Sequence, residues 1–111
     1  MPEAHALLNS ALRSTLLPAA ADAFGFAPST LRVNEALVVK YDAASGHNAL
    51  PVHVDFSLLT LNVALSPPAE YDGGGTWFQH DGQVLTCGRG EGLLHAGGLT
   101  HCGVPVTKGR A

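Results

Sequence analysis

Glycine and proline interrupt this 111-residue chain so often that only short elements can form after its first two dozen residues. All 13 glycines follow residue 24, as do most of the seven prolines. Because both residues mark turns, their spacing predicts short strands joined by tight turns. Apolar residues make up 46% of the chain and charged residues 14%, which is a globular composition for one domain. We therefore predict a single α+β domain, 1–111, with a mainly β body.

The first 25 residues differ from the rest, because their apolar side chains recur at three- and four-residue steps. Leucines and alanines between residues 3 and 17 then share one face of a helix. Pro18 cannot sit inside that helix, but it can begin a second short helix that Gly25 ends. We expect this helical lead-in, 1–25, to pack as a lid on the β core.

The rest of the chain predicts extended segments separated by loops. Alternating apolar residues make 57–65 the most strand-like stretch, and β-branched residues favour a strand over 35–41. A hairpin is expected over 76–85, turning at the His80-Asp81-Gly82 sequence. Shorter extended pieces are expected at 52–55, 93–95 and 99–106, and the glycine-rich stretches 71–75 and 88–92 are expected to be loops.

Charge and hydropathy exclude several classes of function. A net charge of −3 and the absence of a Lys/Arg cluster argue against a nucleic-acid surface. No apolar run reaches the roughly 20 residues that cross a bilayer, and no signal peptide is recognisable. The chain is therefore expected to be soluble, with its compartment open. Cys87 and Cys102 allow one disulfide or two free thiols.

His53 and Asp55 are spaced to bind one metal ion. On an extended segment side chains alternate, so residues two apart project to the same face. A later histidine on a strand that folds back could add a third ligand, and both His95 and His101 are available. Two imidazoles and a carboxylate suit iron(II) with open positions better than a structural zinc. A His-x-Asp pair also arises by chance, and the alternative is a surface pair that binds nothing.

Three blocks of sequence, 53–65, 71–78 and 94–101, resemble one family in both residues and order. They resemble the catalytic domain of the 2-oxoglutarate- and iron(II)-dependent dioxygenases of the prolyl 4-hydroxylase and procollagen-lysine hydroxylase type. The resemblance extends from about residue 38 to 109 and implies a double-stranded β-helix, or jelly-roll, over 31–111 with iron between two sheets. It implies hydroxylation of an unactivated C–H bond of a peptidyl prolyl or lysyl residue or of a small molecule. Oxygen and 2-oxoglutarate are the implied co-substrates, and ascorbate is the implied reductant.

The resemblance also assigns roles to residues. The metal ligands that it implies are His53, Asp55 and His101. His95 matches a histidine that does not bind the metal. Tyr41 and Asn62 match positions that contact the co-substrate.

The carboxyl end departs from the family pattern. The family anchors the distal carboxylate of 2-oxoglutarate with a basic residue about ten positions after the second ligand histidine, and counting from His101 this position is Ala111. Arg110 is one step short, so on a strand its side chain turns to the opposite face, and it is a weak candidate. The last core strand would also be missing, which predicts a C-terminally truncated fragment or a relative that binds metal without turnover. The remaining alternative is a β-sandwich interaction module whose histidines bind nothing.

Overall fold

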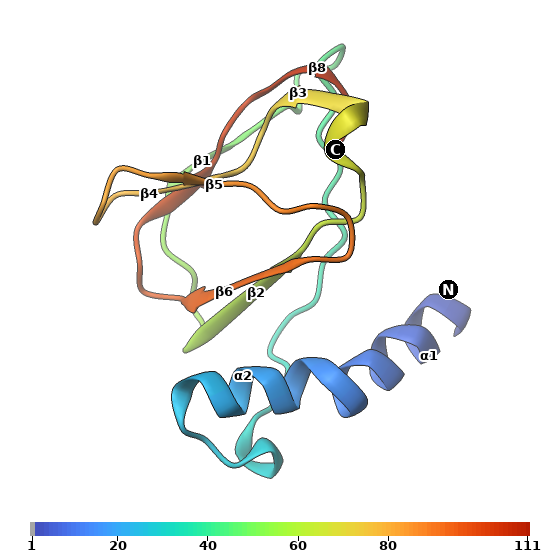
Figure 1. Ribbon diagram of the computed structural model, residues 1–111, viewed down its shortest axis with the longest axis vertical. Helices are drawn as coiled ribbons and strands as arrows, with labels where there is room; N and C mark the ends of the chain where they lie inside the picture. The colour runs from blue at the N-terminus through green and yellow to red at the C-terminus, as the bar shows by residue number, and fades with distance from the viewer. Residues whose placement is uncertain (1) are drawn as a thin grey trace. The chain divides into compact units, whose positions relative to one another are not determined.

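The described part of the computed structural model, residues 2–111, begins with a continuous helical segment that contains Pro18 (Figure 1). Helix α1 (Pro2–Ala11) leads into a π-helical stretch, η1 (Leu12–Leu16), and then into α2 (Leu17–Phe24). Pro18 has no N–H to donate to the carbonyl four residues before it. Immediately before Pro18 the hydrogen bonds of the helix take a five-residue spacing, and the Leu17 N–H donates to the Leu12 carbonyl. Gly25 ends α2 with a φ of +78°. The predicted second helix is confirmed, but a π-helical turn joins it to the first where a break was predicted.

The apolar segment after the helices is not the strand that its residues predict. A 3-10 turn, η2 (Pro28–Thr30), occupies the predicted turn, but 35–41 has no strand assignment. Leu37 and Val38 are 73% and 84% exposed. Within the described segment 35–41, only Tyr41 forms backbone hydrogen bonds to another segment. It exchanges two with Ala111, at 2.8 and 2.9 Å. The prediction was wrong because β-branched residues form a strand only where a neighbour offers backbone partners.

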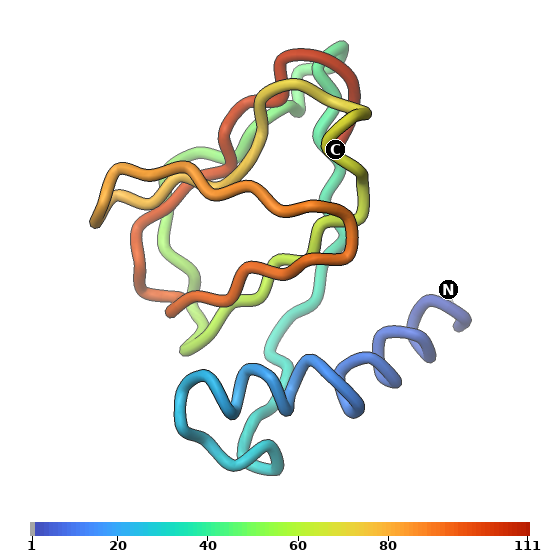
Figure 2. Tube along the Cα trace, in the orientation of Figure 1, coloured from blue at the N-terminus to red at the C-terminus, as the bar shows by residue number. Residues whose placement is uncertain are grey.

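Residues 37–111 form one compact unit, which is built from antiparallel strands. The helical residues 2–36 belong to a second unit. The eight strands are β1 (Leu50–His53), β2 (Leu59–Val63), β3 (Tyr71–Gly73), β4 (Thr76–Phe78), β5 (Val84–Leu85), β6 (Gly92–Ala96), β7 (His101–Gly103) and β8 (Val106–Gly109). They form a four-stranded sheet in the order β1-β7-β4-β5 and two pairs, β2-β6 and β3-β8. The Cα trace in Figure 2 shows the same arrangement without the ribbons. The mainly β body is confirmed, and the jelly-roll stays a prediction.

Several strands lie in segments that the sequence predicts as extended. The predicted hairpin is the β4–β5 pair, β2 lies within 57–65, and β6 covers 93–95. The glycine-rich stretch predicted as a loop instead contains β3. The last predicted extended segment, 99–106, contains β7 but only the first residue of β8. Strands β3 and β8 pair with each other across more than 30 residues, a partnership that no local pattern reveals.

The core of this second unit is small and partly polar. Its buried side chains are those of Phe78, Val106, His95 and His101. Two of these four side chains are imidazoles, so the predicted site residue His101 lies in the core of the unit. Cys87 and Cys102 are free thiols.

No helix among residues 2–111 is long and apolar enough to cross a membrane.

Replacing Val106 with alanine should lower the free energy of unfolding by about 2 kcal/mol, because it removes two buried methyl groups and leaves a cavity. Val106 is 1% exposed, whereas Val38 is 84% exposed. Val38→Ala is therefore the matched control and should change stability by less than about 0.5 kcal/mol. Urea denaturation followed by circular dichroism measures both variants. Equal losses would show that Val106 does not anchor the core.

Candidate metal centre

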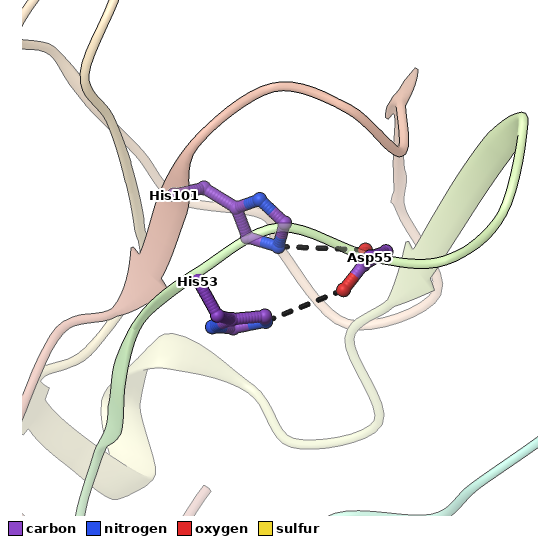
Figure 3. Close-up of side chains that lie close together, drawn as sticks. All are labelled: His53, Asp55 and His101. Atoms are coloured by element: carbon purple, nitrogen blue, oxygen red, sulfur yellow. Dashed lines mark ion pairs between the residues drawn. The ribbon is translucent and has the colours of Figure 1, made fainter.

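Three side chains lie close together, one from β1, one from β7 and one from the segment that follows β1 (Figure 3). His53 is the last residue of β1 and lies opposite His101 of β7 in the antiparallel register. Asp55 follows β1, and its backbone N–H donates to the Gly97 carbonyl at 2.8 Å. Nε2 of His53 lies 3.3 Å from Oδ1 of Asp55, and Nε2 of His101 lies 3.5 Å from Oδ2. One ligand atom from each residue lies within 4.8 Å of the other two.

Backbone carbonyls fix which nitrogen of each imidazole carries the proton. Nδ1 of His53 lies 2.6 Å from the Pro51 carbonyl, and Nδ1 of His101 lies 2.7 Å from the Leu99 carbonyl. A carbonyl only accepts, so each Nδ1–H donates and each neutral ring presents its Nε2 lone pair to the carboxylate. Such carbonyl partners are the usual support of metal-binding histidines. The arrangement could hold a metal ion between the two imidazoles and Asp55.

Two hydroxyl groups support the carboxylate. Thr60, on β2, donates its hydroxyl proton to Oδ2 of Asp55 at 2.7 Å, and the Ser57 hydroxyl lies 3.0 Å from the Thr60 hydroxyl. Neither Ser57 nor Thr60 was predicted from the sequence to belong to the site. The only signal available was the face that Thr60 and Asn62 share on the predicted strand 57–65.

His95 lies beside the three ligand candidates but outside their group. Its ring is buried between Phe78 and His101, with centroids 5.1 and 4.6 Å away. Its Nδ1 lies 2.8 Å from the Ala96 carbonyl, and its buried Nε2 has no hydrogen-bond partner. Of the two histidines that could complete the His53 and Asp55 pair, the structure brings His101 to it.

The two predicted co-substrate residues have different surroundings. Tyr41 stacks on His47, and its phenol oxygen lies at β7, where a Cβ on Gly103 would come within 3.0 Å of it. Burial raises the pKa of the Tyr41 phenol above its ordinary value, so the group keeps its proton at neutral pH and can donate a hydrogen bond. Asn62 is exposed on β2, opposite Leu93 of β6.

Arg110 turns away from the face that Tyr41 and Ala111 share. Arg110 forms an isolated β-bridge with Asp42, and its Nε lies 3.4 Å from the Asp42 carboxylate. Ala111 is paired with Tyr41 through the two backbone hydrogen bonds. Because adjacent residues of an extended chain face opposite ways, Arg110 and Ala111 project to opposite sides. The structure therefore places Arg110 in a surface ion pair, with its side chain 70% exposed.

Comparison with known proteins gives partial but clear similarity. No protein-family model matches the chain. The chain is 41% identical over 78 residues to procollagen-lysine,2-oxoglutarate 5-dioxygenase 1 of Mus musculus, a match that covers 67% of this chain and 11% of the relative. It is 42% identical over 76 residues to the multifunctional procollagen lysine hydroxylase and glycosyltransferase LH3 of Rattus norvegicus, covering 65% and 10%. The chain thus matches about a tenth of the length of these curated relatives. Over about two thirds of its length, this sequence is related to the procollagen-lysine 2-oxoglutarate dioxygenases.

Proposed function

We propose that residues 37–111 form the iron(II)-binding core of a 2-oxoglutarate-dependent hydroxylase of the lysyl hydroxylase type. The observation that carries this proposal is the convergence of His53, Asp55 and His101, with the lone pairs of both imidazoles directed at the carboxylate. The similarity to procollagen-lysine dioxygenases supports the same conclusion independently.

The donor set fits iron(II). Two imidazole nitrogens and one carboxylate oxygen, with no thiolate in the group, form the ligand set of non-haem iron oxygenases. Three protein ligands leave the other positions of an octahedral ion open for small molecules. Iron bound there would supply the redox chemistry that couples oxidation of 2-oxoglutarate by oxygen to hydroxylation of a C–H bond, with ascorbate as the reductant.

The chain's own residues would orient and shield the reactants. His101 is held by its bond to the Leu99 carbonyl, and its buried ring packs against Phe78 at a centroid distance of 5.8 Å. Tyr41 keeps its phenol proton and so can donate to a co-substrate carboxylate. Asn62, on the same face of β2 as Thr60, is the second proposed co-substrate contact.

A lysyl residue in a peptide is the proposed substrate, because the similar proteins are named for procollagen lysine. A peptidyl prolyl residue is the alternative that the sequence resemblance also implies. Both substrates require the same abstraction of hydrogen from an unactivated carbon.

A specific observation favours a second candidate function, metal binding without efficient turnover. The expected anchor position holds Ala111, and the neighbouring Arg110 pairs with Asp42 on the other face. A 2-oxoglutarate molecule at the metal would then lack a charged partner for its distal carboxylate. The two candidates share the metal centre and differ in their affinity for 2-oxoglutarate.

Removing any one metal ligand should abolish tight binding of iron(II) or manganese(II). His53→Ala, Asp55→Ala and His101→Ala should each weaken binding more than the roughly 10–100-fold that loss of a supporting residue costs. Anaerobic isothermal titration calorimetry measures the affinities. His80→Ala is the matched control, because His80 and Asp81 also lie 3.5 Å apart but are exposed on a turn. Absence of binding by the wild-type chain would favour the interaction module and refute the metal centre.

Placing arginine at position 111 should strengthen 2-oxoglutarate binding. One charge-assisted hydrogen bond contributes about 1.5–3 kcal/mol, so Ala111→Arg should lower the Kd for 2-oxoglutarate by roughly 10–100-fold in the metal-loaded protein. Succinate release should rise with it from a low wild-type level. Arg110→Ala is the control and should change neither quantity. High succinate release by the wild-type chain that is lost in Arg110→Ala would identify Arg110 as the anchor and contradict this account.

A further inference from the structure

We infer that Ser57 and Thr60 form a hydroxyl brace that fixes the orientation of the Asp55 carboxylate in the metal centre. The inference rests on the proposed metal centre and assigns these two residues a positioning role. Neither residue is itself a ligand candidate in that centre.

The direction of the hydrogen bonds in the brace follows from its chemistry. Asp55 as a carboxylate only accepts, so the hydroxyl proton of Thr60 points to Oδ2 at 2.7 Å. Thr60 has one hydroxyl proton, and its oxygen must therefore accept from Ser57 at 3.0 Å. The resulting chain runs from Ser57 through Thr60 to Asp55. A hydroxyl that is itself an acceptor donates more strongly, which strengthens the bond to the carboxylate.

The brace acts on a carboxylate whose two oxygens both face the ligand histidines. Oδ1 lies 3.3 Å from Nε2 of His53, and Oδ2 lies 3.5 Å from Nε2 of His101 while it accepts the Thr60 proton at 2.7 Å. Rotation of the carboxylate away from the two rings would lose the Thr60 bond. The brace therefore holds Asp55 in the orientation that faces both imidazoles.

The surrounding backbone fixes the brace in place. The N–H of Asp55 donates to the Gly97 carbonyl at 2.8 Å, and the N–H of Gly97 donates to the Leu58 carbonyl at 3.0 Å. A Cβ at Gly97 would overlap the Ser57 carbonyl and come within 2.8 Å of the Ser57 hydroxyl. Only glycine therefore permits this approach, which clamps 55–58 against the turn that follows β6.

The same rung of the β2–β6 pair supports both sides of the centre. Thr60 lies directly opposite His95 in the register. Thr60 holds the carboxylate, and the His95 ring packs edge-on against His101. The β2–β6 pair therefore contacts and orients two of the proposed ligands, His101 of β7 and Asp55 after β1.

Thr60→Val tests the inference because valine keeps the shape of threonine and removes only the hydroxyl. The probe is manganese(II) alone, titrated into the protein while the free ion is followed by its electron paramagnetic resonance signal. Thr60→Val should bind manganese(II) roughly 10–100-fold more weakly than the wild-type chain. Thr60→Ser keeps the hydroxyl and should behave as the wild type, and Ser57→Ala should weaken binding less than Thr60→Val.

Thermal unfolding of the metal-free variants separates positioning from folding, since all four proteins should unfold at similar temperatures. Equal manganese(II) affinity in wild type and Thr60→Val would overturn the brace and leave the metal centre intact. A wild-type chain that binds no manganese(II) would overturn the metal centre and the brace together.

Discussion

The second unit depends on one electrostatic constraint: a carboxylate and two imidazole lone pairs face one another beside a buried core. The Nδ1 protons of His53 and His101 are already donated to backbone carbonyls, so neutral rings have none to share with Asp55. Electron-rich atoms 3.3 and 3.5 Å apart repel unless a positive charge lies with them, and partial burial strengthens that repulsion. Protonation of the rings would supply such a charge, and so would a metal ion. The carbonyl bonds orient both rings in the same way for either charge, and the metal is the one that the proposed function requires.

The small core and the candidate site overlap, because the buried His101 belongs to both. Phe78 packs against both buried imidazoles, His95 and His101, so aromatic packing replaces the aliphatic core that a larger domain would have. The register of β1 and β7 sets the distance between the ligand histidines. The β2–β6 pair then supplies the hydroxyl that orients Asp55. A change in either sheet would move a ligand.

The sequence predicts those features that follow from the pattern of a segment's own residues. Period-two alternation was enough to place His53 and Asp55 together, and turn residues were enough to predict the β4–β5 hairpin. The segment 35–41 has the residues of a strand but no backbone partner before Tyr41, and β3 lies in a glycine-rich stretch but pairs with β8. Local propensity does not encode which segments find a partner. Thr60 and Ser57 were missed for a related reason. Their hydroxyls act through a bend that Gly97 permits, and no spacing rule describes that bend.

The proposed metal binding and the proposed catalysis are separable in this chain because different strand contacts determine the two groups of residues. The ligands come from β1, β7 and the segment that follows β1, and none of them depends on the carboxyl end. The co-substrate anchor depends on which of two adjacent residues shares a face with Tyr41. Gly109, with a φ of +76°, ends β8 immediately before Arg110, and the bridge to Asp42 then fixes the alternation. A single residue of register thus separates a charged side chain from the face where the proposed co-substrate would need it, while the metal centre stays unchanged.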